Sequence, residues 1–414
     1  MTSNVIPMGT NYRFRVDSIW LGWAKKSNDL EKKQVAFICL QNKETLVELV
    51  HPISEFIMEN WKYSSYNTQR KHALNTTVFL NYLLEERNKY KLKSLLDLEL
   101  QHAEDFLNKL TKAEKSRETV SDHERTISKL YRFLSSQSCL PKVNPACFQS
   151  YINQEGETIH ISPFKNVILP AKISTPHEHS FPSKYLPLLF EIATLIAKPI
   201  ALGIYLQIFG GLRVGEVVNI KRTSMKQSLD GHSLLLNIKE SFFRTDIKDG
   251  DGANYVKKPR PQQVFILKDW FTSLYEDHIS IFKPTDGTNA LFVNRDGKAM
   301  SAKSYRQHFD KVKKYFIKVL KQSPNIDDKL LGHHLSVTSW STHIGRGIFS
   351  NMLAEIAQNP YDIAVPRGDD SLLSALTYLK KTTRFREKLE DRLNSMQNRY
   401  LPRLLKEKSN DVGE

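Results

Sequence analysis

The sequence predicts a mainly α-helical protein with a small antiparallel β-sheet, an α+β fold in which a smaller helical domain precedes a larger one. Apolar residues recur at helical spacing through residues 64–137, which is the pattern of a helical bundle. Prolines and a loss of periodicity then mark residues 151–182 as a linker. Residues 183–414 combine helical patterns with two short apolar runs, which predicts helices around a small sheet.

Residues 1–60 form an N-terminal extension whose fold the sequence leaves open. The runs at 35–40 and 45–50 are rich in β-branched and apolar residues and predict two strands. These strands would form either a small separate β-structure or an extension packed on the next domain.

Residues 61–150 predict a compact bundle of about four helices with positive charge on their polar faces. The candidates for contact with DNA phosphates are Arg70, Lys71, Arg117, Arg125, Lys129 and Arg132. Such a face is often merely solvated, so phosphate contact and simple solvation are equally good interpretations of this segment alone.

The larger domain begins with an apolar segment, residues 185–209, that predicts a buried helical region closed by two glycines. Strands are predicted at residues 233–238 and 262–267, on either side of a turn at 246–254. Further helices are predicted at about 268–282, 301–321, 342–358 and 369–380, followed by a charged tail helix at about 384–407.

The charge of the chain favours a polyanionic partner. Lysine and arginine number 60 against 45 aspartates and glutamates, which gives a net charge of +15 and a pI of about 9.4. No apolar run approaches the roughly 18 residues that a membrane-spanning helix needs, and the polar N-terminus does not begin like a signal peptide. Nucleic acid is therefore favoured over a membrane, and we expect a cytoplasmic protein that associates with nucleic acid.

The cysteines do not suggest a disulfide scaffold or a zinc site. Cys39, Cys139 and Cys147 are too few and too widely spaced for either, and are typical of thiols in a reducing cytoplasm. The histidines also lack the cysteine or carboxylate neighbours of a metal site, so we predict no metal and no other cofactor.

Two short stretches hold residues suited to bind one anion. Gly-Leu-Arg-Val-Gly-Glu contains Arg213 and ends at Glu216. Ser-Thr-His-Ile-Gly-Arg contains His343 and ends at Arg346. Each pair lies three residues apart and therefore on one face of a helix. Tyr378 closes a leucine-rich stretch downstream. Each residue alone has a plainer role in an ion pair, a helix end or a core, so their order and combination carry the prediction.

With these motifs in this order, the chain resembles the tyrosine recombinases, the phage integrase family of site-specific DNA recombinases and transposon integrases. The stretch ending at Glu216 is similar to that family's first-arginine box. Thr342-His343-Ile344-Gly345-Arg346 is similar to its His-x-x-Arg box, and Leu376-Thr377-Tyr378 occupies the place of its nucleophile. The resemblance covers residues from about 64 to 380.

The resemblance implies a helical core-binding domain at 61–150 that clamps DNA, and an integrase-type catalytic domain at 183–414 with a C-terminal tail helix. The partner would be double-stranded DNA, bound by a homo-oligomer that forms a tetramer on the DNA and that accessory DNA-bending factors could assist. The gene would belong to a mobile genetic element, and the protein to a bacterial cytoplasm.

By the same resemblance, the chain cleaves and rejoins DNA strands through a 3′-phosphotyrosyl intermediate without metal or ATP. Arg213 and Arg346 would clamp the non-bridging oxygens of the phosphodiester, since guanidinium groups are planar, permanently charged and bidentate. Tyr378 would be the nucleophile, and His343 would accept a proton or donate a hydrogen bond. Glu216 would orient Arg213 or the neighbouring histidine rather than take part in the chemistry.

The leaving 5′-oxygen needs a proton, which the family takes from a lysine on a β-hairpin. Lys257, seven residues before Val264, has the spacing that best resembles the family and is favoured. Lys248, at the other end of the turn, is the alternative, and Lys258 also stays open.

One position departs from the family pattern. Where a histidine or tryptophan usually follows the glycine of the Leu-Gly-His box, this chain has Asp369. An ionised carboxylate cannot donate a hydrogen bond to phosphate, and it adds negative charge beside an anion. Asp369 is either protonated, or turned towards Arg367 or His343, or the site is weakened. Two alternative functions stay open: a type IB topoisomerase-like enzyme that nicks and reseals DNA, and a catalytically weakened DNA-binding relative.

Overall fold

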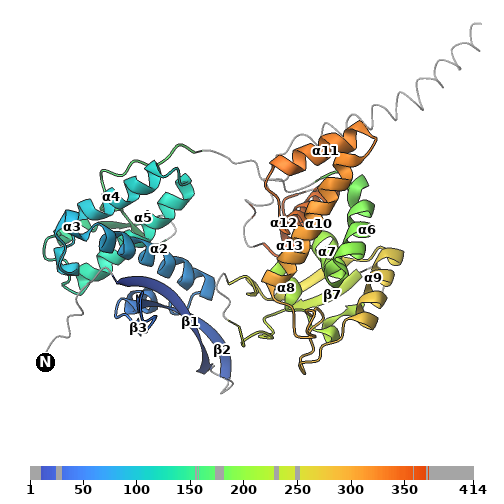
Figure 1. Ribbon diagram of the computed structural model, residues 1–414, viewed down its shortest axis with the longest axis horizontal. Helices are drawn as coiled ribbons and strands as arrows, with labels where there is room; N and C mark the ends of the chain where they lie inside the picture. Colours follow the sequence, from blue (N-terminus) through green and yellow to red (C-terminus); the bar gives the residue numbers. More distant parts are fainter. Residues whose placement is uncertain are drawn as a thin grey trace, which may run out of the picture. The chain divides into compact units, whose positions relative to one another are not determined.

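The computed structural model describes residues 11–24, 30–153, 156, 158–172, 181–227, 233–247, 252–357, 359–369 and 372. The chain divides into two compact units (Figure 1). Unit 1 comprises residues 1–175 and 245–252, and unit 2 comprises residues 176–244 and 253–414. Both units are mainly α-helical with small antiparallel sheets, which confirms the predicted fold class. The boundaries predicted at residues 60, 150 and 182 stay predictions.

Unit 1 contains a three-stranded sheet, a set of helices and a short hairpin. In chain order these are β1 (Tyr12–Ala24), β2 (Leu30–Asn42), β3 (Glu48–Val50), α1 (Ser54–Trp61), α2 (Tyr66–Glu85), α3 (Arg87–Tyr90), α4 (Leu100–Lys112), α5 (Arg117–Ser136), β4 (Ser150–Ile152) and β5 (Thr158–His160). Short 3-10 helices lie at Leu95–Asp97 and Pro145–Cys147.

Strands β1 and β2 lie beside α2 in unit 1 (Figure 1). Residues of these strands and of the helices form one hydrophobic core. Ile38 of β2, Phe56 of α1 and Phe79 of α2 are fully buried in it, together with Tyr131 of α5. The side chain of Ser65 caps α2 by accepting a backbone N–H from its first turn. The β-like runs of the N-terminal extension therefore form β2 and β3. Strand β2 packs on the helices and β3 pairs with β2, so the extension shares the structure of unit 1.

Unit 2 is built mostly from helices around a three-stranded sheet. In chain order these are α6 (Leu186–Ile196), α7 (Lys198–Gly210), α8 (Val214–Val218), β6 (Lys226–Gln227), β7 (Ser233–Ile238), β8 (Arg260–Phe265), α9 (Lys268–Ile281), α10 (Ala302–Gln322), α11 (Ile326–Val337), α12 (His343–Ile356) and α13 (Tyr361–Arg367). Short 3-10 helices lie at Ser183–Tyr185 and Arg222–Ser224.

Helix α7 is buried on all sides. Every residue from Ile200 to Gly210 is buried, so the helix has no polar face. Its Gln207 accepts a hydrogen bond from the hydroxyl of Tyr305 on α10 at 2.9 Å, which satisfies a polar group inside the core. The buried region predicted at 185–209 is confirmed, but it is divided into α6 and α7 because Ala197 adopts φ −143° and ψ 41°, outside the helical region.

The sheet of unit 2 is antiparallel with the strand order β6–β7–β8. It confirms the strands predicted at 233–238 and 262–267, although β8 begins two residues earlier than predicted. Along β8, Gln262 and Val264 are buried while their neighbours are exposed. One face of β8 therefore points into unit 2.

The helices predicted at 268–282, 301–321 and 342–358 are confirmed as α9, α10 and α12. Helix α11 is not predicted from the sequence. Its apolar residues Ile326 and Leu330 are exposed, so the helix has no continuous apolar face that a sequence pattern could show.

The C-terminal part of the chain is described only in part. Of the helix predicted at 369–380, Asp369 and Leu372 are described, and the predicted tail helix lies outside the described residues. Within the described ranges, no helix is both long enough and apolar enough to cross a membrane.

Candidate active site

Arg213 lies at the turn between α7 and α8. Gly211 ends α7 with φ +64°, in the left-handed region that favours glycine, and a Cβ there would clash with the ring of Phe349 on α12. Arg213 follows at the N-cap of α8, where its backbone N–H donates to Oε2 of Glu216 at 2.8 Å. The turn therefore lies directly against α12, the helix that carries the second arginine.

Glu216 is buried and joins two arginines. Its Oε1 accepts hydrogen bonds from Nη1 of Arg213 at 3.1 Å and from Nη1 of Arg260 at 2.7 Å, and its Oε2 accepts one from Nη2 of Arg260 at 3.2 Å. Burial acts to raise the pKa of Glu216, but the hydrogen bonds and charges of Arg260 and Arg213 outweigh it, so the pKa lies below its usual value. The carboxylate is therefore ionised and holds both guanidiniums in place.

Arg260 belongs to this group, although the motifs do not identify it. Only 7% of its side chain is exposed, and its Nε donates to Oε1 of Gln262 at 2.8 Å. The alternation of inward and outward side chains along a β-strand could have predicted that Arg260 is buried. Arg260, Gln262 and Val264 lie on one face of β8, and the last two are buried, so Arg260 faces the interior as well.

Arg346 projects from α12 and is also buried. Its Nη1 donates to the backbone oxygen of Gly211 at 2.7 Å, and its Nη2 donates to the backbone oxygen of Arg367 at 2.9 Å and to Oδ1 of Asp369 at 2.7 Å. Burial and the nearby charge of Arg213 lower its pKa to about 10, against the opposite effect of Asp369. Arg346 is therefore protonated at neutral pH.

Asp369 is turned towards arginines, and 12% of its side chain is exposed. Besides Arg346, its Oδ1 lies 3.8 Å from Nη2 of Arg213, and its Oδ2 lies 3.2 Å from Nε of Arg367. Of the orientations that the sequence left open for Asp369, the structure has the one towards Arg367. We call the following six side chains the arginine cluster: Arg213, Glu216, Arg260, Arg346, Arg367 and Asp369.

Gln262 links β8 to α13, a role that no sequence pattern predicts. It is 2% exposed, and its Nε2 donates to the backbone oxygen of Pro366 at 2.7 Å. Gly368 ends α13 with φ +64°, and a Cβ there would clash with the side chain of Arg260. The close approach of β8 to the end of α13 thus fixes the position from which Asp369 reaches the arginines.

The arginine cluster is suited to bind an oxyanion. Its four guanidiniums outnumber its two carboxylates, which leaves a surplus of two positive charges in a largely buried setting. Arg213, with 25% of its side chain exposed, is the member most open to solvent. Among the described residues, no group of three or more histidine, cysteine or carboxylate side chains could hold a metal ion.

The structure places the other predicted residues less completely. His343 is the first residue of α12, is exposed, and lies nearly one helical turn before Arg346. Lys257 is exposed in the segment that leads into β8. Tyr378 and Lys248 lie outside the described residues. The roles predicted for these residues stay predictions.

Leu372 is the described residue nearest in sequence to Tyr378. It packs against Phe349 and Leu353 of α12 and against Ile363 of α13. The chain is therefore anchored beside α12 six residues before the predicted nucleophile.

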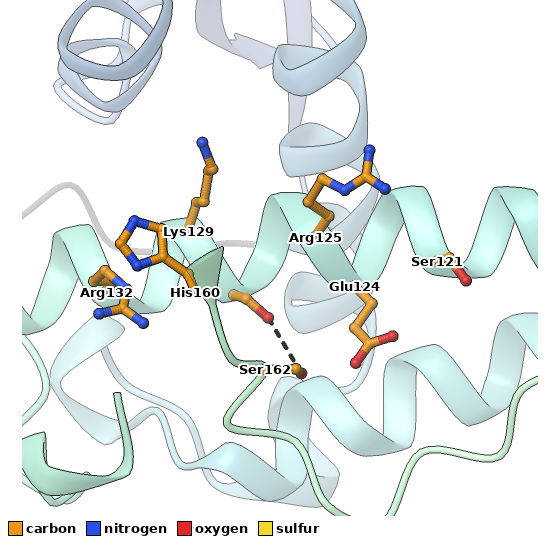
Figure 2. A pocket seen from close by; sticks show the side chains of 8 residues that line it. Ser121, Glu124, Arg125, Lys129, Arg132, His160 and Ser162 are labelled. Carbon is orange, nitrogen blue, oxygen red and sulfur yellow. Dashed lines mark hydrogen bonds between the residues drawn. The ribbon is translucent and has the colours of Figure 1, made fainter. Parts of the chain in front are cut away.

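Unit 1 has a separate pocket on α5 with a volume of about 270 Å³. Its lining residues are Ser121, Glu124, Arg125, Ser128, Lys129, Arg132, His160 and Ser162. Figure 2 shows Arg125 and Lys129, four residues apart, extending to the same side of α5. Burial and the charge of Arg125 lower the pKa of Lys129, and burial with the charges of Arg132 and Lys129 lowers the pKa of His160. The lining has three basic side chains, Arg125, Lys129 and Arg132, against the single carboxylate of Glu124, so the pocket carries a surplus of positive charge.

Five of the six predicted DNA-binding residues also have contacts within unit 1. Arg132 donates to the backbone oxygens of residues 148 and 149, both at 3.1 Å, and Arg117 donates to the backbone oxygen of residue 170 at 3.2 Å. Lys71 forms an ion pair with Asp122 at 2.5 Å. Arg125 lies 3.7 Å from Asp122 in an ion pair, and Nζ of Lys129 lies 5.3 Å from the ring centroid of Trp61. Arg125 and Lys129 both line the pocket and stay candidates for phosphate contact, and DNA binding by the six residues stays a prediction.

The fold of unit 1 and unit 2 together is similar to that of known recombinases. The Tn1549 transposon integrase in complex with circular intermediate DNA matches with a TM-score of 0.51 and 14% identity, over 78% of this chain and 94% of that one. The XerH site-specific recombinase, in a post-cleavage complex with palindromic difH substrate, matches with a TM-score of 0.50 and 15% identity, over 77% of each chain. This chain has the tyrosine recombinase fold. No protein-family model matches the sequence, and no curated protein matches it.

Proposed function

We propose that the chain is a site-specific DNA recombinase or integrase that cleaves and rejoins DNA strands through a 3′-phosphotyrosyl intermediate. One observation carries the proposal: Nη2 of Arg346 and Nη2 of Arg213 lie 2.7 Å and 3.8 Å from the same oxygen, Oδ1 of Asp369. Two guanidiniums that converge on one carboxylate oxygen can converge equally on a phosphate oxygen. The fold shared with the Tn1549 integrase and XerH supports the same function.

In this mechanism Arg213 and Arg346 bind the non-bridging oxygens of the scissile phosphodiester. The transition state of an in-line attack carries about two negative charges, and the surplus of two positive charges in the arginine cluster would stabilise it. The cluster is fixed by Glu216 and by backbone acceptors, so little reorganisation is needed when charge develops.

Tyr378 attacks the phosphorus atom, and the bond from phosphorus to the 5′-oxygen breaks. The products are a 3′-phosphotyrosyl enzyme and a free 5′-hydroxyl, and the intermediate keeps the energy of the phosphodiester bond. Attack by a 5′-hydroxyl on the intermediate then reforms the DNA strand without ATP. His343 accepts the proton of the tyrosine, and Lys257 donates a proton to the 5′-oxygen.

Double-stranded DNA is the proposed partner, and the net charge of +15 supports it. The pocket on α5, with Arg125 and Lys129, would contact the DNA backbone and so position the duplex without reading its sequence. Recombination joins two duplexes, so we also propose that the chain acts as a homo-oligomer, with four copies in the complete assembly.

The experiment that tests the proposal is covalent capture on DNA. Nicked fragments of genomic DNA from the organism that carries the gene are incubated with the full chain, because loss of a short segment at the nick prevents religation and traps the intermediate. We expect a protein–DNA adduct that survives denaturation with wild-type protein and disappears with Tyr378→Phe. Identical results for the two proteins would overturn the proposal. Relaxation of supercoiled DNA without any exchanged strands would favour a topoisomerase-like activity instead.

A catalytically weakened DNA-binding relative is the second candidate, because the carboxylate of Asp369 already lies against the arginines that would bind phosphate. This candidate predicts normal DNA binding without any adduct. A gel-shift assay run beside the capture experiment separates the two functions.

A further inference from the structure

The carboxylate of Asp369 lies among the arginines to which the proposed function assigns the phosphate. Its Oδ1 accepts a hydrogen bond from Nη2 of Arg346 at 2.7 Å, with Nη2 of Arg213 at 3.8 Å on the same atom. Its Oδ2 faces Nε of Arg367 at 3.2 Å. Three guanidiniums thus surround one carboxylate, which presents two oxygens as a phosphate presents its non-bridging pair.

The position of this carboxylate is set by the backbone. The backbone N–H of Asp369 donates to the oxygen of Ala364 at 3.0 Å, closing the last turn of α13. Gly368 directly before it leaves no space for a side chain beside Arg260. The main chain therefore holds Asp369 next to the arginines, while rotation about its side-chain bonds is enough to remove the carboxylate from them.

The charge of the arginine cluster makes such a removal feasible. Glu216 remains bound to Arg213 and Arg260 in either case, through contacts of 3.1 Å and 2.7 Å that do not involve Asp369. Arg346 also keeps its two backbone acceptors, Gly211 and Arg367. Removal of the carboxylate requires that another anion takes its place, because leaving buried guanidiniums without a counter-charge has a high free-energy cost.

From this geometry we infer that Asp369 is a resident anion of the phosphate site, which the substrate phosphate must displace. The inference rests on the proposed function for the identity of that phosphate as a DNA phosphodiester. When phosphate displaces Asp369, the arginines exchange their contacts with the carboxylate for contacts with the phosphate. The net free energy of phosphate binding is therefore small unless other DNA contacts hold the phosphate in place. Asp369 therefore acts as a specificity-determining residue: it disfavours isolated anions and non-specific DNA, and admits a phosphate that the rest of the protein positions.

Anion binding by the full chain tests the inference without any need for catalysis. The midpoint of thermal unfolding is measured as sulfate replaces chloride at constant ionic strength, for wild type and for Asp369→Asn. We expect Asp369→Asn to bind sulfate at least roughly tenfold more tightly than wild type, because its arginines lack the internal competitor. Asp310→Asn removes an exposed carboxylate on α10 and should behave as wild type, which corrects for the general stabilising effect of sulfate.

Two further variants test whether the charge of residue 369, rather than the shape of its side chain, controls sulfate binding. Asp369→Glu keeps the carboxylate and should show no gain in sulfate binding, and Arg346→Lys combined with Asp369→Asn should lose the gain. If Asp369→Asn does not fold in chloride, recovery of its folded state in sulfate or inorganic phosphate supports the inference equally. A folded Asp369→Asn that binds sulfate no better than wild type would overturn it, as would an unfolded one that neither anion restores.

The outcome is independent of the covalent capture described above. A gain in sulfate binding together with no adduct in any variant would reject recombinase chemistry but keep the resident anion. An adduct with wild type, together with no gain in sulfate binding by Asp369→Asn, would support recombinase chemistry and reject the resident anion. Asp369 would then be a fixed support for Arg213 and Arg346.

Discussion

Arg260 and Glu216 form a bidentate ion pair inside unit 2. Nη1 and Nη2 of Arg260 bind the two carboxylate oxygens of Glu216 at 2.7 Å and 3.2 Å, and the side chains are 7% and 1% exposed. The pair links β8 to α8, and α8 directly follows Arg213. The position of a predicted catalytic arginine thus depends on a buried arginine that belongs to no motif.

Replacing Glu216 should therefore destabilise unit 2 strongly. Glu216→Gln keeps the shape of the side chain but leaves two largely buried guanidiniums without their carboxylate, so we expect a loss of about 3 kcal/mol in the free energy of unfolding. Urea denaturation measures it. The control Asp277→Asn breaks an exposed ion pair with Lys198 and should cost less than about 1 kcal/mol. Equal losses in the two variants would contradict the role given to Glu216.

Arg346→Lys should abolish covalent capture while leaving the protein folded. A lysine keeps the positive charge but cannot bind Gly211, Arg367 and a phosphate at once, so we expect adduct formation to fall by about 100-fold or more. The control Arg222→Lys removes a guanidinium that also binds two backbone oxygens, at 2.6 Å and 3.0 Å, but outside the arginine cluster. Adduct formation by this control should stay within about threefold of wild type.

The proton donor for the 5′-oxygen can be identified with a substrate that does not need one. A DNA strand with sulfur in place of the bridging 5′-oxygen has a leaving group that departs without protonation. Among Lys257→Ala, Lys258→Ala and Lys248→Ala, the donor is the variant that is inactive on normal DNA and active on the sulfur substrate. We expect it to be Lys257→Ala, and rescue of Lys248→Ala alone would instead assign the role to Lys248.

The pocket on α5 makes a prediction about salt dependence. Arg125→Gln and Lys129→Gln should each weaken binding to any DNA sequence and reduce the slope of log affinity against log salt by about 1, because each would remove one phosphate contact. Lys109→Gln on α4 removes a lysine that pairs with Glu86 at 3.2 Å and should leave the slope unchanged. An unchanged slope in all three variants would make the charged face of α5 merely solvated.

Unit 2 should lose stability as the pH falls below about 6.5. Burial lowers the pKa of His278 to about 4, with a smaller opposite effect from its hydrogen bond to the backbone oxygen of Leu291 at 2.9 Å. The unfolded chain therefore binds more protons than the folded chain between about pH 6.5 and 4, and stability falls over that range by at most about 3 kcal/mol. His278→Gln should flatten the stability profile of unit 2 over this range, as followed by denaturation at several pH values. A profile as steep as that of wild type would show that another group is responsible.

The order of the predicted catalytic residues is contained in the sequence. Arg213 and Glu216 lie close because they are the N-cap and the third residue of α8, and this local relationship needs no knowledge of the rest of the fold. His343 and Arg346 lie three residues apart on α12, which is also a local relationship. The apolar segment of α6 and α7 and the strand β7 are likewise visible as local patterns. Helix α11 is not, because it has too few buried residues to produce a pattern.

The composition of the arginine cluster was decided only by the tertiary structure. Arg260 reaches Glu216 across 44 residues of sequence, and Arg346 reaches Gly211 across 135. Neither contact follows from local spacing, since each depends on how β8 and α12 pack against the turn after α7. The orientation of Asp369 has the same origin: the sequence showed that a carboxylate replaces the usual residue, and the packing of α13 against β8 turned that carboxylate towards the arginines.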